Sequence, residues 1–61
     1  MKNTFKHFVA KCTEKDRNIW TILGVDFENK EHFVTTMDYT EFTEKIRWNS
    51  YTYQGLTVFT R

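Results

Sequence analysis

The stretch His32–Trp48, "HFVTTMDYTEFTEKIRW", decides the fold because its pattern changes part-way along. His32–Thr36 is rich in β-branched and aromatic residues, which favour a short strand. Asp38 is a preferred helix N-cap residue, and Glu41 follows at the capping-box position. The stretch therefore predicts a strand that is followed almost at once by a helix.

The predicted helix has a second start signal and an apolar stripe. Met37 and Phe42 have the spacing of a hydrophobic staple around the N-cap. Tyr39, Phe42 and Ile46 recur three and four positions apart, as residues do on the buried face of an amphipathic helix. Polar residues take over at Asn49–Ser50, where we expect the helix to end.

Two further strands precede this stretch and one follows it. Thr4–Thr13 and Asn18–Phe27 are rich in β-formers and are separated by four polar residues, and Leu56–Arg61 follows a glycine. We predict a single domain, residues 1–61, of the α+β class. Its small antiparallel β-sheet has three to four strands with one amphipathic helix packed on one face, in the order β-β-(β)-α-β.

One helix covers only one face of such a sheet. Alternation in the first strand places Phe8, Ala10 and Cys12 on one side, and Phe5, His7, Val9 and Lys11 on the other. In the second strand, Trp20 and Ile22 point away from Ile19, Thr21, Leu23, Val25 and Phe27. The face without the helix is then either an exposed apolar patch or a surface covered by long side chains and by the Tyr51–Tyr53 segment.

Composition excludes several classes of protein. The 61-residue chain has a formal net charge of +1, from nine basic and eight acidic residues that are interspersed, so it lacks the basic footprint of a duplex-DNA binder. Cys12 is the only cysteine, which predicts a buried thiol in a reducing compartment. No apolar run approaches the roughly 18 residues that span a membrane. We expect a cytoplasmic protein, in a host cell, that does not contact the membrane.

No motif in the sequence indicates catalysis or metal binding. His7 and His32 lack a cysteine or a second histidine at ligand spacing. Ser50 is the only serine, and nothing beside it marks it as activated. A glycine-rich phosphate loop is absent as well. We therefore predict that the protein is not an enzyme and that it uses no cofactor and no metal.

Trp48 falls where a helix usually carries a polar residue, nearly opposite Tyr39. If the helix reaches it, Trp48 is an exposed anchor for a protein partner, with Arg47 beside it, because tryptophan and arginine are enriched in interface hot spots. If the helix ends earlier, Trp48 folds back over the small core. The sequence leaves both interpretations open.

The segment His32–Ile46 resembles the corresponding segment of the Dmd-like antitoxins of T4-type phages. It covers about a quarter of the chain, and the rest agrees with the family in length and element order. The likeness rests on an aromatic followed by a small residue and two threonines, then on an aromatic, an acid, a hydrophobe and a lysine before the next core position: Phe33, Val34, Thr35, Thr36, Tyr39, Glu41, Phe42, Lys45 and Ile46.

This resemblance implies a small protein inhibitor. Dmd-like proteins bind RnlA- and LsoA-type endoribonuclease toxins of the bacterial host and block their active site. The toxin-binding aromatic maps to Phe33, where the family pattern has tryptophan, and a contributing polar helix residue maps to Thr43, where it has asparagine. We expect a host protein as partner, with a toxin favoured, and the candidate partner-binding residues are Phe33, Thr43, Trp48, Arg47 and Trp20.

Two other functions stay open. The tail "RWNSYTYQGLTVFTR" is loosely similar to the small RNA-polymerase inhibitors of T7-like phages, which implies an inhibitor of host RNA polymerase or of another host enzyme. Aromatics such as Phe8, Phe33 and Trp20 on a small sheet also suit a single-stranded nucleic-acid-binding module, although the basic groove of such a module is missing. The oligomeric state, the strand order and the binding face are left open.

Overall fold

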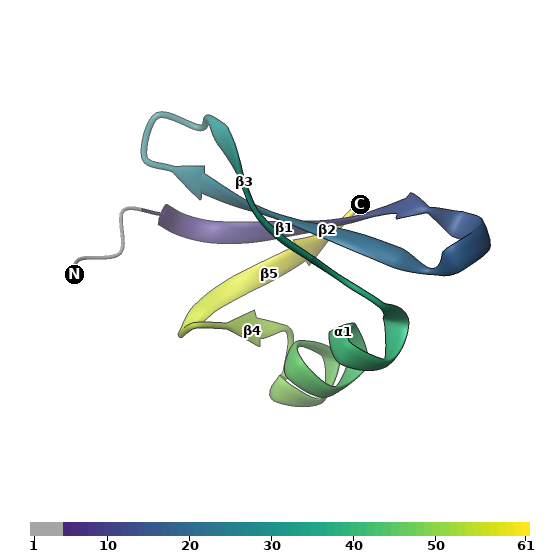
Figure 1. The fold of residues 1–61 in the computed structure, drawn as a ribbon. Coiled ribbons are helices and arrows are strands. Elements are labelled where there is room, and N and C mark those ends of the chain that lie inside the picture. Colours follow the sequence, from purple (N-terminus) through teal and green to yellow (C-terminus); the bar gives the residue numbers. More distant parts are fainter. Residues whose placement is uncertain (1–4) are drawn as a thin grey trace.

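The computed structural model describes residues 5–61, so Thr4, the first residue of the predicted first strand, lies outside the described residues. The α+β class is confirmed: a sheet carries one short helix on one side (Figure 1). The elements are β1 (Phe5–Glu14), β2 (Ile19–Asp26), β3 (Glu31–Met37), α1 (Tyr39–Lys45), β4 (Thr52–Tyr53) and β5 (Leu56–Thr60). The order is thus β-β-β-α-β-β, with one more short strand than expected.

The sheet is mixed, with strand order β3-β2-β1-β5-β4. Three of its neighbouring pairs are antiparallel, but β5 runs parallel to β1, with Val9 opposite Phe59. This differs from the purely antiparallel sheet that the sequence predicts. The chain leaves β3, crosses one face of the sheet as α1 and returns on the far side of β1, and parallel strands require a crossover of this kind.

The helix begins where the sequence places it. The side chain of Asp38 accepts a hydrogen bond from the backbone N–H of Glu41 at 2.8 Å, which confirms the N-cap. The Glu41 carboxylate pairs with Lys45 at 3.0 Å. Both staple residues, Met37 and Phe42, are buried in one cluster. The α-helix ends at Lys45 and a 3₁₀ turn, Arg47–Asn49, continues to the predicted end.

The core lies between α1 and one face of the sheet. Ile46 of the predicted apolar stripe is completely buried, whereas Tyr39 is 42% exposed and lies at the surface. At the surface, the Tyr39 hydroxyl accepts a hydrogen bond from Arg47 Nη1 at 2.8 Å. The buried residues in contact with one another are Phe8, Ala10, Ile22, Met37, Phe42, Ile46 and Val58.

An irregularity in β1 reverses the expected orientation of Phe5. The register of β1 on β2 shifts between Phe5 and His7, so alternation does not hold across this step. Phe5 therefore packs on the same side as Phe8, with ring centroids 5.9 Å apart in an edge-to-face arrangement. Its ring lies over Gly24: a Cβ at that glycine would come within 2.6 Å of it. Gly24 is small because Phe5 occupies the space above it.

Candidate functional site

The face of the sheet opposite α1, which we call the open face, carries a row of apolar residues across four strands. Residues paired across neighbouring strands point to the same face. Phe33 of β3 pairs with Leu23, Leu23 pairs with Val9, and Val9 pairs with Phe59 of β5. Val9 lies between Phe8 and Ala10, which are in the core, so the row points away from the helix. We call Phe33, Leu23, Val9 and Phe59 the apolar row.

The two ends of the apolar row are exposed and its middle is not. Phe33 is 68% exposed and Phe59 is 53% exposed. Val9 in the centre is only 2% exposed, and Leu23 is half-buried. Edge-to-face contact with the His7 ring, at a centroid distance of 5.0 Å, supports Phe59 without covering it. Two large exposed aromatic side chains thus flank a centre that is shielded from solvent by other side chains.

An ion-pair network covers that centre. Glu31 Oε2 lies 2.7 Å from Arg61 Nη2, and Glu31 Oε1 lies 3.5 Å from Lys11 Nζ. Glu31 is on β3, whereas Lys11 is on β1 and Arg61 follows β5. The ion pairs must therefore cross the strands between, where the middle of the apolar row lies. The sequence left two interpretations of this face open, a cover of long side chains or an exposed apolar patch. Long side chains cover its centre, whereas its aromatic ends are exposed.

Tyr53 takes no part in covering the open face. Its ring packs edge-to-face on Phe8, with the centroids 5.3 Å apart, and it borders the core on the helix side of the sheet. The predicted cover by the Tyr51–Tyr53 segment is therefore wrong for Tyr53. The reason is the path of the chain, because β4 pairs with β5 beside α1 (Figure 1).

Trp48 and Arg47 lie at the end of the helix, away from the open face. Trp48 is 73% exposed although the α-helix ends three residues before it. It therefore combines features of both sequence-based interpretations: the helix stops early, yet the side chain does not fold over the core. Arg47 is held by its hydrogen bond to Tyr39.

Trp20 packs against the core, and Thr43 of the helix is half-buried. The Trp20 ring stacks on Phe42 with a centroid distance of 4.4 Å and an interplanar angle of 8°. Trp20 Nε1 and Thr43 Oγ1 are both buried, and neither has a hydrogen-bond partner among residues 5–61. Of the candidate residues, only Phe33 is on the open face. The structure does not bring the five together.

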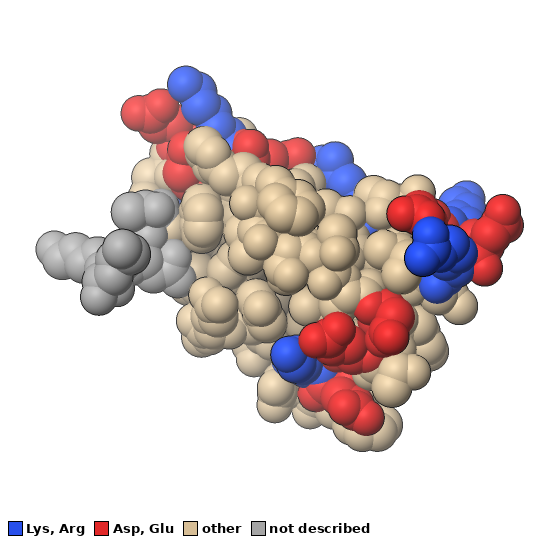
Figure 2. Space-filling model, in the orientation of Figure 1, with Lys and Arg blue, Asp and Glu red and all other residues tan. Residues whose placement is uncertain are grey.

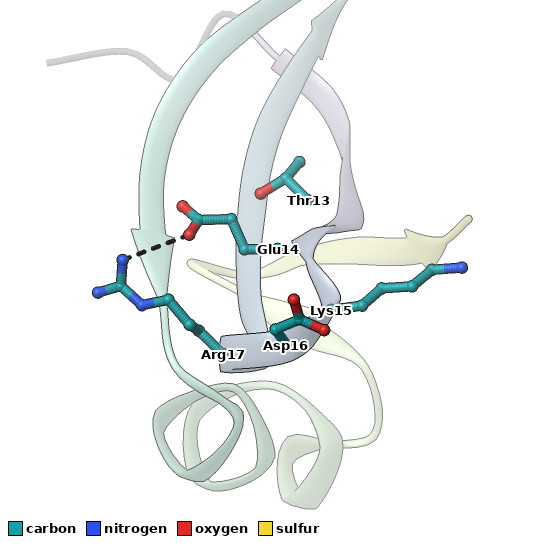
Figure 3. Close-up of a pocket in the computed structure, with 5 residues that line it drawn as sticks. All are labelled: Thr13, Glu14, Lys15, Asp16 and Arg17. Carbon is teal, nitrogen blue, oxygen red and sulfur yellow. Dashed lines mark hydrogen bonds and ion pairs between the residues drawn. The ribbon is translucent and has the colours of Figure 1, made fainter.

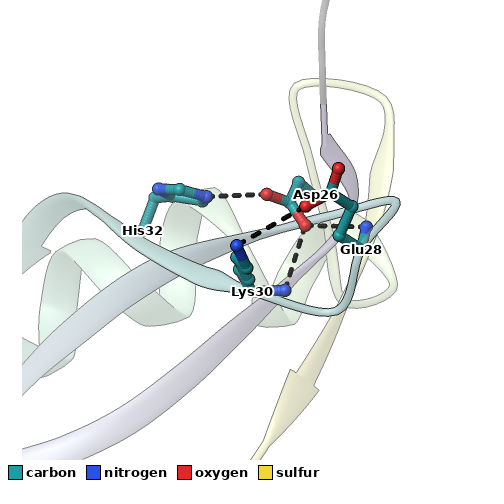
Figure 4. Close-up of polar contacts among 4 residues, drawn as sticks. All are labelled: Asp26, Glu28, Lys30 and His32. Carbon is teal, nitrogen blue, oxygen red and sulfur yellow. Dashed lines mark hydrogen bonds and ion pairs between the residues drawn. The ribbon is translucent and has the colours of Figure 1, made fainter.

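The turn between β2 and β3 is fixed by Asp26 (Figure 4). Its Oδ1 accepts hydrogen bonds from the backbone N–H groups of Glu28 at 2.8 Å and Lys30 at 3.0 Å, and its Oδ2 lies 2.8 Å from His32 Nε2. The contact with His32, followed by the backbone bond from Lys30, lowers the pKa of Asp26 to about 2. This turn sets the start of β3 and so the position of Phe33.

A shallow pocket of about 350 Å³ lies at the opposite turn, between β1 and β2 (Figure 3). It is lined by the end of β1 and the turn that follows, Thr13–Arg17, whose side chains are exposed. Glu14 and Arg17 form an ion pair across it at 3.4 Å. A pocket with such solvated walls lacks the dry, mostly apolar lining of a typical ligand site.

Within the described part of the chain, no group of three histidine, cysteine or acidic side chains is arranged to hold a metal ion. Cys12 is half-buried, not fully buried as predicted, because it lies near the end of β1, where the exposed turn begins. None of the helices in residues 5–61 is both long enough and apolar enough to cross a membrane.

Comparison with known proteins found no match to the chain among protein-family models, curated proteins or solved structures. Inferences about function therefore depend on the chain itself. Phe59 was not among the residues predicted from the sequence. The one local signal for it is that it follows the core residue Val58 in a strand, so its side chain points to the opposite face. Sequence reasoning also missed the Glu31 network, which depends on strands that are distant in sequence.

Proposed function

We propose that this protein is a small inhibitor of the phage type, which binds a host enzyme through the open face of its sheet and occludes that enzyme. The observation that carries the proposal is Phe33, a large aromatic that is 68% exposed at the end of the apolar row. Exposed aromatics of this kind anchor protein interfaces, where a few of them provide most of the binding energy. An inhibitor needs such a surface and no chemistry of its own.

The charge distribution favours a protein partner over a nucleic acid. On the open face, Lys11 and Arg61 share the carboxylate of Glu31, which offsets half of their positive charge. The face shown in Figure 2 also has no large basic patch, because red side chains lie beside the blue ones in each charged group. A binder of single-stranded nucleic acid needs a continuous basic groove beside its stacking aromatics.

The resemblance of His32–Ile46 to Dmd-like antitoxins favours an RnlA- or LsoA-type endoribonuclease toxin as the target. Phe33 occupies the position of the family's toxin-binding aromatic, and it is exposed. Thr43 occupies the position of the contributing polar helix residue, but its hydroxyl is buried. We therefore assign binding to Phe33 and its neighbours on the open face.

The test is a titration of the purified protein into an RnlA- or LsoA-type toxin, with RNA cleavage and complex formation followed together. We expect stoichiometric loss of cleavage with the wild type. Phe33→Ala should abolish it while the thermal unfolding transition stays close to that of the wild type. Full cleavage and no complex with the wild type would refute this target.

Trp48→Ala is the matched control, because Trp48 is as exposed as Phe33 but lies at the end of the helix. This variant should inhibit as the wild type does. The opposite result, with inhibition lost in Trp48→Ala and kept in Phe33→Ala, would move the binding surface to the helix end. The same pair of variants can be assayed against host RNA polymerase, the competing target.

A further inference from the structure

The ion-pair network on the open face leaves one cation loosely held. Arg61 lies 2.7 Å from Glu31, which is an ordinary distance for a charged hydrogen bond. Lys11 lies 3.5 Å from the other oxygen of the same carboxylate, beyond that range. A lysine ammonium has three donors, so Lys11 retains capacity for a second acceptor. Its side chain is 38% exposed.

We propose that the open face binds a protein segment that carries a carboxylate between two apolar side chains, with the carboxylate on Lys11 and the apolar groups on Phe33 and Phe59. The inference rests on the proposed function, because it takes the open face as the binding surface. It adds the chemistry of the partner, which the fold and the choice of target enzyme leave undefined.

Charge complementarity supports an acidic partner. Two side-chain cations, Lys11 and Arg61, share the single carboxylate of Glu31, so the side chains of the network have one more positive than negative charge. It lies at the centre of the open face, over Val9, where a docking segment would have to pass. An incoming carboxylate is attracted there, whereas an incoming lysine or arginine is repelled.

The geometry of the apolar row defines the spacing in the partner. Phe33 and Phe59 are on β3 and β5, which are separated by β2 and β1. Neighbouring strands are about 4.8 Å apart, so the backbones of the two phenylalanines are roughly 14 Å apart. An extended strand spans that distance in about four residues and keeps both side chains on one face, whereas a helix needs about nine residues, or two and a half turns, which puts the side chains on opposite faces. The segment therefore needs two apolar side chains at this separation with an acidic residue between them.

The experiment uses two blocked synthetic peptides that are rich in β-branched residues, which favour an extended conformation, and the ¹⁵N-labelled protein. Both peptides have two leucines four positions apart, on the same face of the extended chain. One has glutamate midway between them and the other has lysine. We expect the glutamate peptide to shift the amide resonances of Val9, Leu23, Phe33 and Phe59. It should bind about three- to fivefold more tightly than the lysine peptide, which is the range of an exposed ion pair.

Two charge variants make the result specific. Lys11→Gln should remove the preference for glutamate, because it removes the loosely held cation. Lys15→Gln removes the same charge from the exposed β1–β2 turn and should leave the preference unchanged. Equal affinity for the two peptides, shifts at α1 instead of the open face, no binding by either peptide, or self-association of the protein through this face would each overturn the inference.

Failure of this inference is distinguishable from failure of the proposed function. If the toxin is inhibited in a Phe33-dependent way but the two peptides bind equally, the open face is an inhibitory surface without the proposed charge selectivity. If the peptides are discriminated but no toxin is inhibited, the partner chemistry stands and the target is a different protein.

Discussion

Gly24→Ala tests the packing of Phe5 on the sheet. The added Cβ would lie 2.6 Å from two carbons of the Phe5 ring, whereas carbon atoms pack at about 3.5 to 4.0 Å. The ring must therefore retreat by roughly 1 Å. It is partly buried, and it contacts Phe8 and His32, with both centroid distances 5.9 Å. Its movement will disturb both neighbours.

Overpacking of this kind costs about 1 to 3 kcal/mol of unfolding free energy. Replacement of glycine by alanine also restricts the unfolded chain, which returns about 0.4 to 1 kcal/mol. The net loss expected for Gly24→Ala is therefore about 1 to 2 kcal/mol. Domains of this length have a total stability of roughly 3 to 9 kcal/mol. The melting temperature should fall by roughly 5 to 15 °C, as measured by circular dichroism.

The refuting result comes from a double-mutant cycle with Phe5→Ala, read out by urea denaturation. Without the ring, the alanine at position 24 has space, so Gly24→Ala should be neutral or slightly stabilising in that background. The coupling free energy between the two sites should then be about 1 to 2 kcal/mol. An equal loss of stability in both backgrounds would show that Phe5 is not the reason for the glycine.

Three further predictions concern the helix and the β2–β3 turn. Ile46→Ala empties a fully buried site and should lower the free energy of unfolding, measured by urea denaturation, by about 3 to 4 kcal/mol, most of the stability of a domain this small. Tyr39→Ala on the exposed side should lower it by less than about 1 kcal/mol. Comparable losses would place the core elsewhere. Asp38→Ala should cost about 1 kcal/mol and Asp38→Ser little, because serine keeps the cap; equal losses would contradict the role of the side chain. Asp26 has a pKa near 2 in the folded state, below its unfolded value near 3.8, so it stabilises the fold above pH 4 and this contribution disappears as the pH falls towards 2. The melting-temperature difference between wild type and Asp26→Asn should shrink over that range, and a constant difference would contradict the assignment.

The sequence predicts best what is decided locally. The start of the helix depends on Asp38, Met37 and Phe42, which are neighbours in the chain, and all three take their predicted roles. The predicted orientation of Phe5 is wrong because it assumed regular alternation along β1, and one irregular step in that strand reverses the alternation. The prediction of a purely antiparallel sheet is wrong for a different reason. No local pattern indicates which side of β1 the distant strand β5 will join.

The candidate site shows the same division. Phe33 could be identified from the sequence because its strand and the resemblance both lie within one short segment. Phe59 could not, because its place on the open face depends on the pairing of β5 with β1. The sequence did not define which face of the sheet carries Trp20, so Trp20 was a candidate for partner binding. In the structure it stacks on Phe42 beneath the helix. Surfaces assembled from three or more strands are not visible in the composition of any one of them.

The parallel pairing of β5 with β1 also has a consequence for how the chain folds. Short turns join β1, β2 and β3, so these three strands can pair early in folding. One edge of β1 stays unpaired until β5 pairs with it, and the Val9–Phe59 contact joins residues fifty positions apart in the chain. Closing so long a loop is slow compared with hairpin formation. We expect this step to limit the folding rate. Until it is complete, the exposed edge of β1 can pair with strands of other chains, so aggregation competes with folding most strongly at that stage.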